Sequence, residues 1–275
     1  MLTQEQITHF QTLGFLLCKQ LLSAEETTYI GAAFDVAMRK ARGGAAEPEL
    51  QQNEQGYSAK RQQVVPFFDY DPDAFYPLLD HEKIAGVFAD LMGEDFILTL
   101  SEGIIHGGGT GWHHDAVAPE GFFTMRAAIY LDPLGPDDGC LSVIPGSHFT
   151  EFRETLIKTI GQLGTRPEDV PGRYSIVNAP GDVLFMNHKL FHAALGNKPG
   201  RRALHINCAQ NTTPEQNQTH FDWLVRFLEG ETRHWGRFYS EGLIATASPR
   251  RHKMMARAIE LGFGNTGPIT HLQDR

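Results

Sequence analysis

One short stretch of the sequence carries the residue types of a metal site. His113, His114 and Asp115 follow a glycine-rich turn and precede a segment rich in strand-forming residues. In an extended chain successive side chains point to opposite faces, so His113 and Asp115 project to one side and His114 to the other. Two imidazoles and one carboxylate hold Fe(II) on one face and leave three positions open. This stretch therefore supplies two of the three ligands of such a site.

The same His-x-Asp spacing occurs again at His220 and Asp222. That copy lies at the entry of a helical pattern, where side chains two positions apart diverge by about 200° around the axis. We therefore expect only the first copy to bind a metal. A candidate for the third ligand is His192, which lies between two strand-like runs and is followed by Arg201 and Arg202.

The elements that must position these residues are mainly of β type. From Asp95 to about Gln210, short apolar runs alternate with Gly, Pro and Asp, which is typical of an all-β sandwich or barrel without the amphipathic spacers of a parallel sheet. The polar stretch 43–63 has almost nothing to bury, and we interpret it as a mobile loop that could serve as a lid. We expect all 275 residues to form one domain with a β core over about 95–210.

Helical patterns flank this core, over about 3–42 and about 214–262. Capping-box spacings at Thr3 and Ser23 start two helices near the amino terminus. In the later segment Trp223, Phe227 and Leu228 fall on one side of a helix. We expect both groups of helices to pack outside the β core.

Composition narrows the class of partner. Lys and Arg number 24 and Asp and Glu 33, giving a net charge of −9, which is opposite to what nucleic-acid or anionic-membrane binding favours. We expect a small-molecule partner, no nucleic acid and no membrane. Three cysteines without a CxxC pair, and a start without a basic segment and an apolar run, favour a reducing cytoplasm. No pattern indicates an oligomeric state.

Taken together, four motifs resemble a known family. The order WHHD, YLDPLGPDDGCLSVIPGSH, GDVLFMNHKLFHAALGN and RRAL is similar to the phytanoyl-CoA dioxygenase family of Fe(II)- and 2-oxoglutarate-dependent oxygenases, over roughly residues 5–210. The resemblance implies a double-stranded β-helix, a cupin-like jelly roll with helices packed outside. It also implies Fe(II) bound by His113, Asp115 and His192, with 2-oxoglutarate as cosubstrate.

The resemblance places the arginine that binds 2-oxoglutarate on Arg201. In the family this arginine usually follows the distal histidine by eleven residues, whereas Arg201 and Arg202 follow His192 by nine and ten. Strand alternation allows only one of the two to face inward. The R-R-A pattern favours Arg201, with Arg202 as the alternative.

By this resemblance the chain hydroxylates a C–H bond of a small metabolite and releases succinate and CO2, with desaturation or cyclisation as related outcomes. Halogenating relatives carry Gly or Ala in place of Asp115, so the carboxylate argues against halogenation. Candidate substrate-binding residues are His106, Arg126, Lys60 and Arg61. The positive charges of Arg126, Lys60 and Arg61 favour an anionic or zwitterionic substrate.

Two other classes of function compete with this interpretation. The same ligands bind zinc or manganese, so the chain could be a cupin-like metalloenzyme of hydrolase or isomerase type. It could also be a non-catalytic small-ligand-binding barrel.

Overall fold

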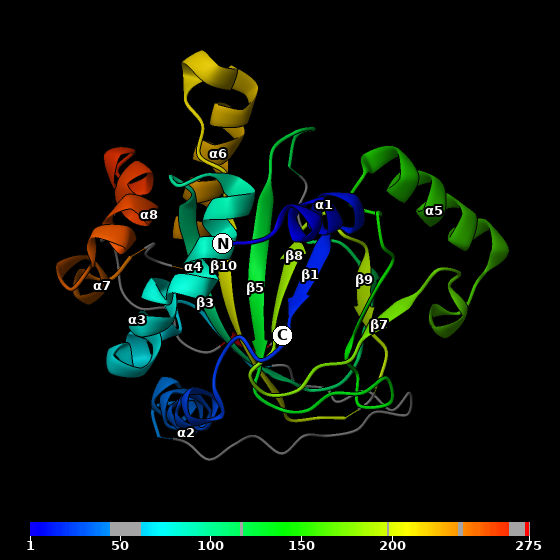
Figure 1. Ribbon diagram of the computed structural model, residues 1–275, viewed down its shortest axis with the longest axis horizontal. Coiled ribbons are helices and arrows are strands. Elements are labelled where there is room, and N and C mark those ends of the chain that lie inside the picture. Colours follow the sequence, from blue (N-terminus) through cyan, green and yellow to red (C-terminus); the bar gives the residue numbers. More distant parts are fainter. Residues whose placement is uncertain (45–61, 116–117, 197, 236–238, 264–272, 275) are drawn as a thin grey trace.

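The computed structural model describes residues 1–44, 62–115, 118–196, 198–235, 239–263 and 273–274. Its described strands form two antiparallel sheets that face each other (Figure 1). In spatial order the large sheet contains β1 (Phe15–Cys18), β8 (Val183–Asn187), β5 (Thr124–Tyr130), β10 (Arg201–Ala209), β3 (Ile97–His106), β2 (Gln62–Val64) and β11 (Gln273–Asp274). The small sheet contains β4 (Thr110–His113), β9 (His192–Ala194), β6 (Leu141–Val143) and β7 (Tyr174–Ile176). The predicted fold class, mainly β with flanking helices, is confirmed.

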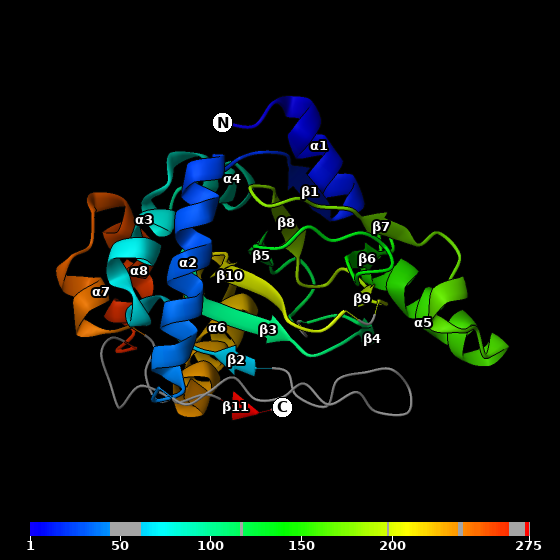
Figure 2. The same ribbon diagram turned by 90° about the horizontal axis from the view of Figure 1, so that it is seen from below.

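Helices cover the outside of this sandwich. They are α1 (Gln4–Leu13), α2 (Ala24–Ala41), α3 (Pro72–Asp80), α4 (Glu82–Met92), α5 (Thr150–Leu163), α6 (Pro214–Trp235), α7 (Glu241–Ala245) and α8 (Pro249–Glu260). Figures 1 and 2 show α2, α3, α4, α7 and α8 beside the large sheet and α5 on the far side, next to the small sheet. The helices α2, α3, α4 and α8 share one hydrophobic core with that sheet.

The first two helices begin where the capping boxes predicted. Thr3 and Ser23 are the N-caps of α1 and α2, and both reciprocal hydrogen bonds of the capping box are present in each. Helix α2 buries Ile30, Phe34 and Met38 at four-residue spacing. This stripe places α2 on the outer face of the large sheet, away from the residues that could do chemistry.

Alternation along the central strands separates the two faces of the large sheet. On β5, Met125, Ala127 and Ile129 pack against the helices, whereas Ala128 and Tyr130 belong to the cluster between the sheets. The same alternation continues through β10 and β8. The space between the sheets is therefore lined by every second residue of β5, β8 and β10.

Two expectations about the chain outside the strands need revision. The stretch 95–210 is not purely β, because α5 lies inside it between β6 and β7. Its segment TEFRETLIKTIGQL is rich in helix-forming residues, yet Phe152 and Leu163 are exposed, so α5 lacks the strong apolar stripe of a core helix. The predicted loop 43–63 falls mostly on 45–61, outside the described residues, and Gln62 and Gln63 belong to β2 rather than to a loop.

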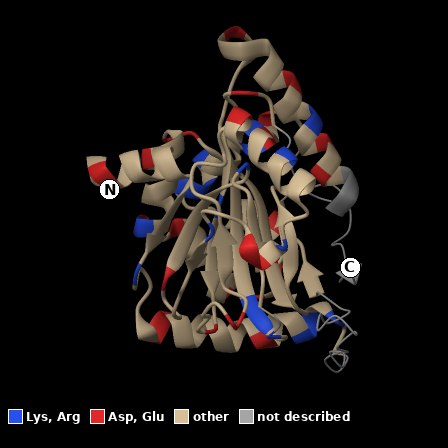
Figure 3. Cartoon of the chain, turned by 90° about the vertical axis from the view of Figure 1, so that its right-hand side faces the viewer, with Lys and Arg blue, Asp and Glu red and all other residues tan. Residues whose placement is uncertain are grey.

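Charged residues of both signs lie mainly on the helices and loops in the view of Figure 3, and the strands between them carry few. Within the described part of the chain, no helix has the length and apolar character needed to cross a membrane.

Candidate active site

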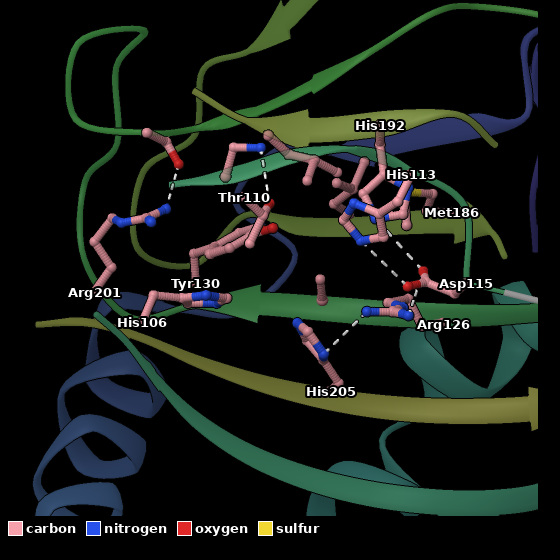
Figure 4. A pocket seen from close by; sticks show the side chains of 15 residues that line it. His106, Thr110, His113, Asp115, Arg126, Tyr130, Met186, His192, Arg201 and His205 are labelled. Atoms are coloured by element: carbon pink, nitrogen blue, oxygen red, sulfur yellow. Dashed lines mark hydrogen bonds and ion pairs between the residues drawn. The ribbon is translucent and has the colours of Figure 1, made fainter. Parts of the chain in front are cut away.

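Three side chains from two distant parts of the sequence converge at one end of the sandwich. His113 ends β4, His192 begins β9, and the two residues are paired in register; Asp115 follows His113 after one residue. The Nε2 atom of His113 lies 3.6 Å from Oδ1 of Asp115, and that of His192 lies 3.5 Å from Oδ2. Ligand atoms on one face of a six-coordinate ion at ~2.1 Å lie about 3 Å apart. The three side chains are therefore spaced as the ligands of one metal ion would be (Figure 4).

Backbone carbonyls fix the tautomer of both histidines. Nδ1 of His113 donates to the carbonyl of Gly111 at 2.7 Å, and Nδ1 of His192 donates to that of Leu190 at 2.8 Å. A carbonyl oxygen only accepts, so Nδ1 carries the proton and Nε2 keeps its lone pair. This is the outer hydrogen bond that metal-binding histidines make. Both rings are therefore held in the form that binds a cation.

Arg126 on β5 fixes the carboxylate. Its Nη2 donates to Oδ2 of Asp115 at 2.5 Å, and its Nη1 donates to Nδ1 of His205 at 3.3 Å. Burial alone would raise the pKa of Asp115, but the Arg126 guanidinium and the neighbouring imidazoles lower that pKa well below its usual range. Burial lowers the pKa of His192 to about 4. At neutral pH the site thus presents a neutral His192 imidazole and an ionised Asp115 carboxylate.

A first cavity extends from this group along the inner face of the large sheet to Arg201. The Arg201 side chain is almost fully buried, at 2% exposure, and three of its five N–H groups donate to the carbonyls of Gly139, Gly108 and Lys198. No carboxylate of the described residues pairs with it. Tyr130 lines the same wall of this cavity. Figure 4 shows Arg201 at one end and the three candidate ligands at the other.

Arg202 points to the other face of the sheet, as strand alternation requires. Its guanidinium donates to Asp132 at 2.8 Å and to Asp35 of helix α2 at 2.9 Å. Of the two adjacent arginines, only Arg201 lines the cavity. The shorter turn before β10 therefore still directs the first arginine of the pair inward.

A second cavity of about 320 Å³ lies on the other side of the Asp115–Arg126 pair. The two cavities share only these two residues. The rest of its lining comes from the sheet and from helix α6, namely Thr99, Leu100, Glu102, Thr124, His188, Asn207, Cys208, Trp223, Phe227 and Glu231. The sequence analysis did not single out Glu102, His188 or Asn207. The signal that could have found His188 is its position four residues before His192 in the same motif.

The other residues considered in the sequence fall in different places. His106 lies opposite Arg201 in the β3–β10 register and lines the first cavity. Lys60 and Arg61 lie outside the described residues. His220 Nε2 donates to the carbonyl of Glu120 at 2.9 Å, and neither His220 nor Asp222 belongs to a metal-ligand group in the described chain.

Comparison with known proteins gives a family and a fold. A model of the phytanoyl-CoA dioxygenase family matches residues 10–203. No curated protein matches the sequence significantly.

Several solved structures share the fold. SnoK from nogalamycin biosynthesis, a non-heme alpha ketoglutarate dependent carbocyclase, is 21% identical, with a TM-score of 0.59 over 76% of this chain and 84% of that one. HygX from Streptomyces hygroscopicus, with nickel and 2-oxoglutarate bound, is 17% identical, with a TM-score of 0.58 over 77% and 88%. EctD from S. alaskensis, with bound Fe, is 19% identical, with a TM-score of 0.57 over 76% and 77%. The similarity of these structures to this chain establishes its fold, which is the predicted double-stranded β-helix.

Proposed function

The chain belongs to the phytanoyl-CoA dioxygenase family, and on that premise we propose that it uses Fe(II) and 2-oxoglutarate to hydroxylate a C–H bond of a small metabolite. One observation carries the proposal: three metal-ligating side chains and a buried arginine without a carboxylate partner in the described chain line a single cavity. A hydrolase or isomerase of this type would give such an arginine no keto acid to bind, and a non-catalytic barrel would have no use for three metal ligands beside it.

His113, Asp115 and His192 would hold Fe(II) through Nε2, one carboxylate oxygen and Nε2. Fe(II) and 2-oxoglutarate, when bound, would let dioxygen act as the oxidant: one oxygen atom would convert the keto acid to succinate and CO2, and the other would go to the substrate. The residues of the chain position these groups. The Nδ1 hydrogen bonds of His113 and His192 keep both imidazoles aimed at one point. Arg126 keeps the Asp115 carboxylate from rotating away from it.

Arg201 would hold the far carboxylate of 2-oxoglutarate. Two of its N–H groups remain after the three carbonyl contacts, and a guanidinium presents such donors in one plane to both oxygens of a carboxylate. Burial strengthens this pairing because water does not compete for the charge. Tyr130 on the same wall would narrow the cavity around the carbon chain.

Asp115 supports oxygen insertion over halogenation, because its carboxylate takes the position that a halide would need. Cyclisation, the reaction named for SnoK, begins from the same C–H cleavage and is the alternative outcome. The expected preference for an anionic or zwitterionic substrate relied partly on Arg126, which already has Asp115 as its partner.

A binding experiment tests the cosubstrate site. Fe(II) and 2-oxoglutarate are added to the protein without oxygen, and the weak visible charge-transfer band is titrated. The natural protein should develop the band and His192→Ala should not. Arg201→Met should weaken 2-oxoglutarate binding by about 10- to 100-fold, because charged hydrogen bonds contribute about 1.5–3 kcal/mol. Arg202→Met is the matched control and should bind 2-oxoglutarate as the natural protein does. Equal binding by both arginine variants would refute the assignment.

A second measurement tests the reaction. Turnover under labelled dioxygen should place one labelled oxygen atom in the product and one in succinate. Product without label would point to cyclisation or desaturation. Absence of any keto-acid consumption with metal bound would favour the hydrolase or binding-barrel alternatives.

A further inference from the structure

The second cavity lies where a primary substrate would have to sit, and its walls differ in chemistry. Its floor is the inner face of the large sheet and its roof is helix α6. Since Asp115 lines both cavities, a molecule in the second would lie beside one of the three candidate metal ligands. This inference rests on the proposed function and concerns the substrate of that same site.

The roof is an aromatic surface. Helix α6 buries Leu224 and Leu228 in the main core, and the neighbouring stripe of Trp223 and Phe227 lines the cavity. The two aromatic rings are parallel within 8°, with centroids 5.1 Å apart. The rings are therefore stacked on each other, and a stacked aromatic pair presents a rigid apolar surface against which the C–H face of a ring can pack.

The floor is polar and consists of a fixed network. Asn207 Nδ2 donates to Glu102 at 2.6 Å, so Asn207 Oδ1 must accept the proton of His188 Nε2 at 3.1 Å. Burial lowers the pKa of His188 to about 3, so the ring is neutral at pH 7 and its Nδ1 is an acceptor. The buried hydroxyl of Thr124 also lines the cavity and has no hydrogen-bond partner. A carboxylate, an imidazole acceptor and an unsatisfied hydroxyl suit a ligand that brings its own donors.

The charges of the residues that line the second cavity also favour a ligand that is not an anion. Arg126 is the one cation among the described lining residues, and its two terminal nitrogens are already bonded to His205 and Asp115. An anionic ligand would enter this buried space without a cation among those residues to pair with it, which is unfavourable. A neutral or amine-bearing ligand does not need such a partner.

We propose that this cavity is the substrate chamber and that it accepts a neutral or amine-bearing ring compound, whose C–H face packs on Trp223 and Phe227 while hydroxyl or amino groups bond to the floor. Its volume of about 320 Å³ lies within the usual range for small-molecule sites. Thr124, Trp223 and Phe227 are then specificity-determining residues.

Three probes with the same ring and different charge test the proposal: D-glucosamine, D-glucose and D-glucuronate. The full chain is loaded with Ni(II) and 2-oxoglutarate, which should prevent turnover, and each probe is titrated by calorimetry. Glucosamine and glucose should bind more tightly than glucuronate. Preference for glucuronate, or no binding of the other two, would overturn the proposal. Failure to load metal and 2-oxoglutarate would instead count against the proposed function.

Substitutions in the lining test whether the probes bind in the second cavity. Phe227→Ala should weaken glucosamine binding about three- to tenfold, the value of one aromatic contact. Thr124→Val keeps the shape of the side chain and should weaken binding by a similar factor. Trp223→Phe preserves a ring and should retain most of the affinity. Phe149→Ala, at a residue 54% exposed beside α5, is the control and should bind like the natural protein. Unchanged binding in both Phe227→Ala and Thr124→Val would exclude this cavity.

Discussion

At the scale of single residues, Arg126 occupies the decisive position. It forms the wall between the two cavities, and its two terminal nitrogens hold Asp115 and His205. Asp115 is the carboxylate of the candidate metal site, so its orientation depends on a residue eleven positions away in the sequence. A basic side chain inside a strand is therefore explained by the carboxylate it holds, without an anionic ligand.

Replacing Arg126 should weaken the metal site without removing any of its ligands. In Arg126→Met the Asp115 carboxylate loses its partner and the influence that lowers its pKa, so Fe(II) affinity should fall by about 10- to 100-fold. Arg126→Lys keeps the positive charge but cannot make the contacts with both Asp115 and His205, so its Fe(II) affinity should fall less. Equilibrium dialysis with Fe(II) under anaerobic conditions measures both.

Arg202→Met provides the comparison for this experiment, because it removes a guanidinium paired with Asp132 and Asp35 outside the cavities. Its Fe(II) affinity should match that of the natural protein. If Arg126→Met also binds Fe(II) normally, then the hydrogen bond to Asp115 has no part in holding the metal.

The sequence was most informative for residues whose roles follow from local geometry. Strand alternation separates Arg201 from Arg202 on β10, and the His-x-Asp spacing identified His113 and Asp115, although β4 ends at His113 and Asp115 lies two residues beyond its end. Glu102 and Asn207 could not be identified, because they meet only through the pairing of β3 with β10. Such pairing joins distant segments, and no spacing within either strand records it.

At the scale of elements, two loops approach unusually closely behind Arg201. A Cβ atom built on Gly196 would lie 2.0 Å from the backbone nitrogen of Gly139. Only glycine permits this approach. Gly139 in turn supplies one of the carbonyls that position the Arg201 guanidinium. The glycine pair therefore links loop packing to the candidate 2-oxoglutarate site.

Gly196→Ala should affect both stability and cosubstrate binding. The added methyl group meets backbone atoms, so the loops must separate, at a cost of about 1–3 kcal/mol in unfolding free energy. Because Gly139 would move with its carbonyl, 2-oxoglutarate should also bind more weakly. Urea unfolding and anaerobic titration measure the two effects.

Gly161→Ala in α5 is the matched control, since a Cβ there meets nothing within 4 Å. Alanine favours the helix, so its stability should be equal or up to about 1 kcal/mol higher, with unchanged 2-oxoglutarate binding. Normal 2-oxoglutarate binding by Gly196→Ala would show that the loop contact does not position Arg201.

Among the elements, the sequence revealed the capped helices and the β core but not the use of helix α6. Trp223, Phe227 and Leu228 were expected on one side of the helix. In the structure Leu228 lies in the core with Leu224, and the two aromatic residues line the cavity. Adjacent positions on a helix differ by about 100°, so one apolar sector can serve two environments. Periodicity identifies the sector but not what each half of it contacts.

At the scale of the whole molecule, the interior holds histidines that must stay neutral for the fold to persist. Burial lowers the pKa of His188 to about 3 and that of His192 to about 4. In the unfolded chain a histidine titrates near 6.5. Between these values the unfolded state binds more protons than the folded state, so stability rises with pH across this window.

Metal-free protein should therefore lose stability as the pH falls from about 6.5 towards 4. Each of the two histidines can contribute up to about 1.4 kcal/mol per pH unit, and urea unfolding in the presence of a chelator measures the sum. His188→Gln removes one titrating group and can still donate to Asn207, so its stability should fall less steeply; His192→Gln should flatten the slope in the same way. A slope that neither substitution changes would mean that other groups control the acid sensitivity of the fold.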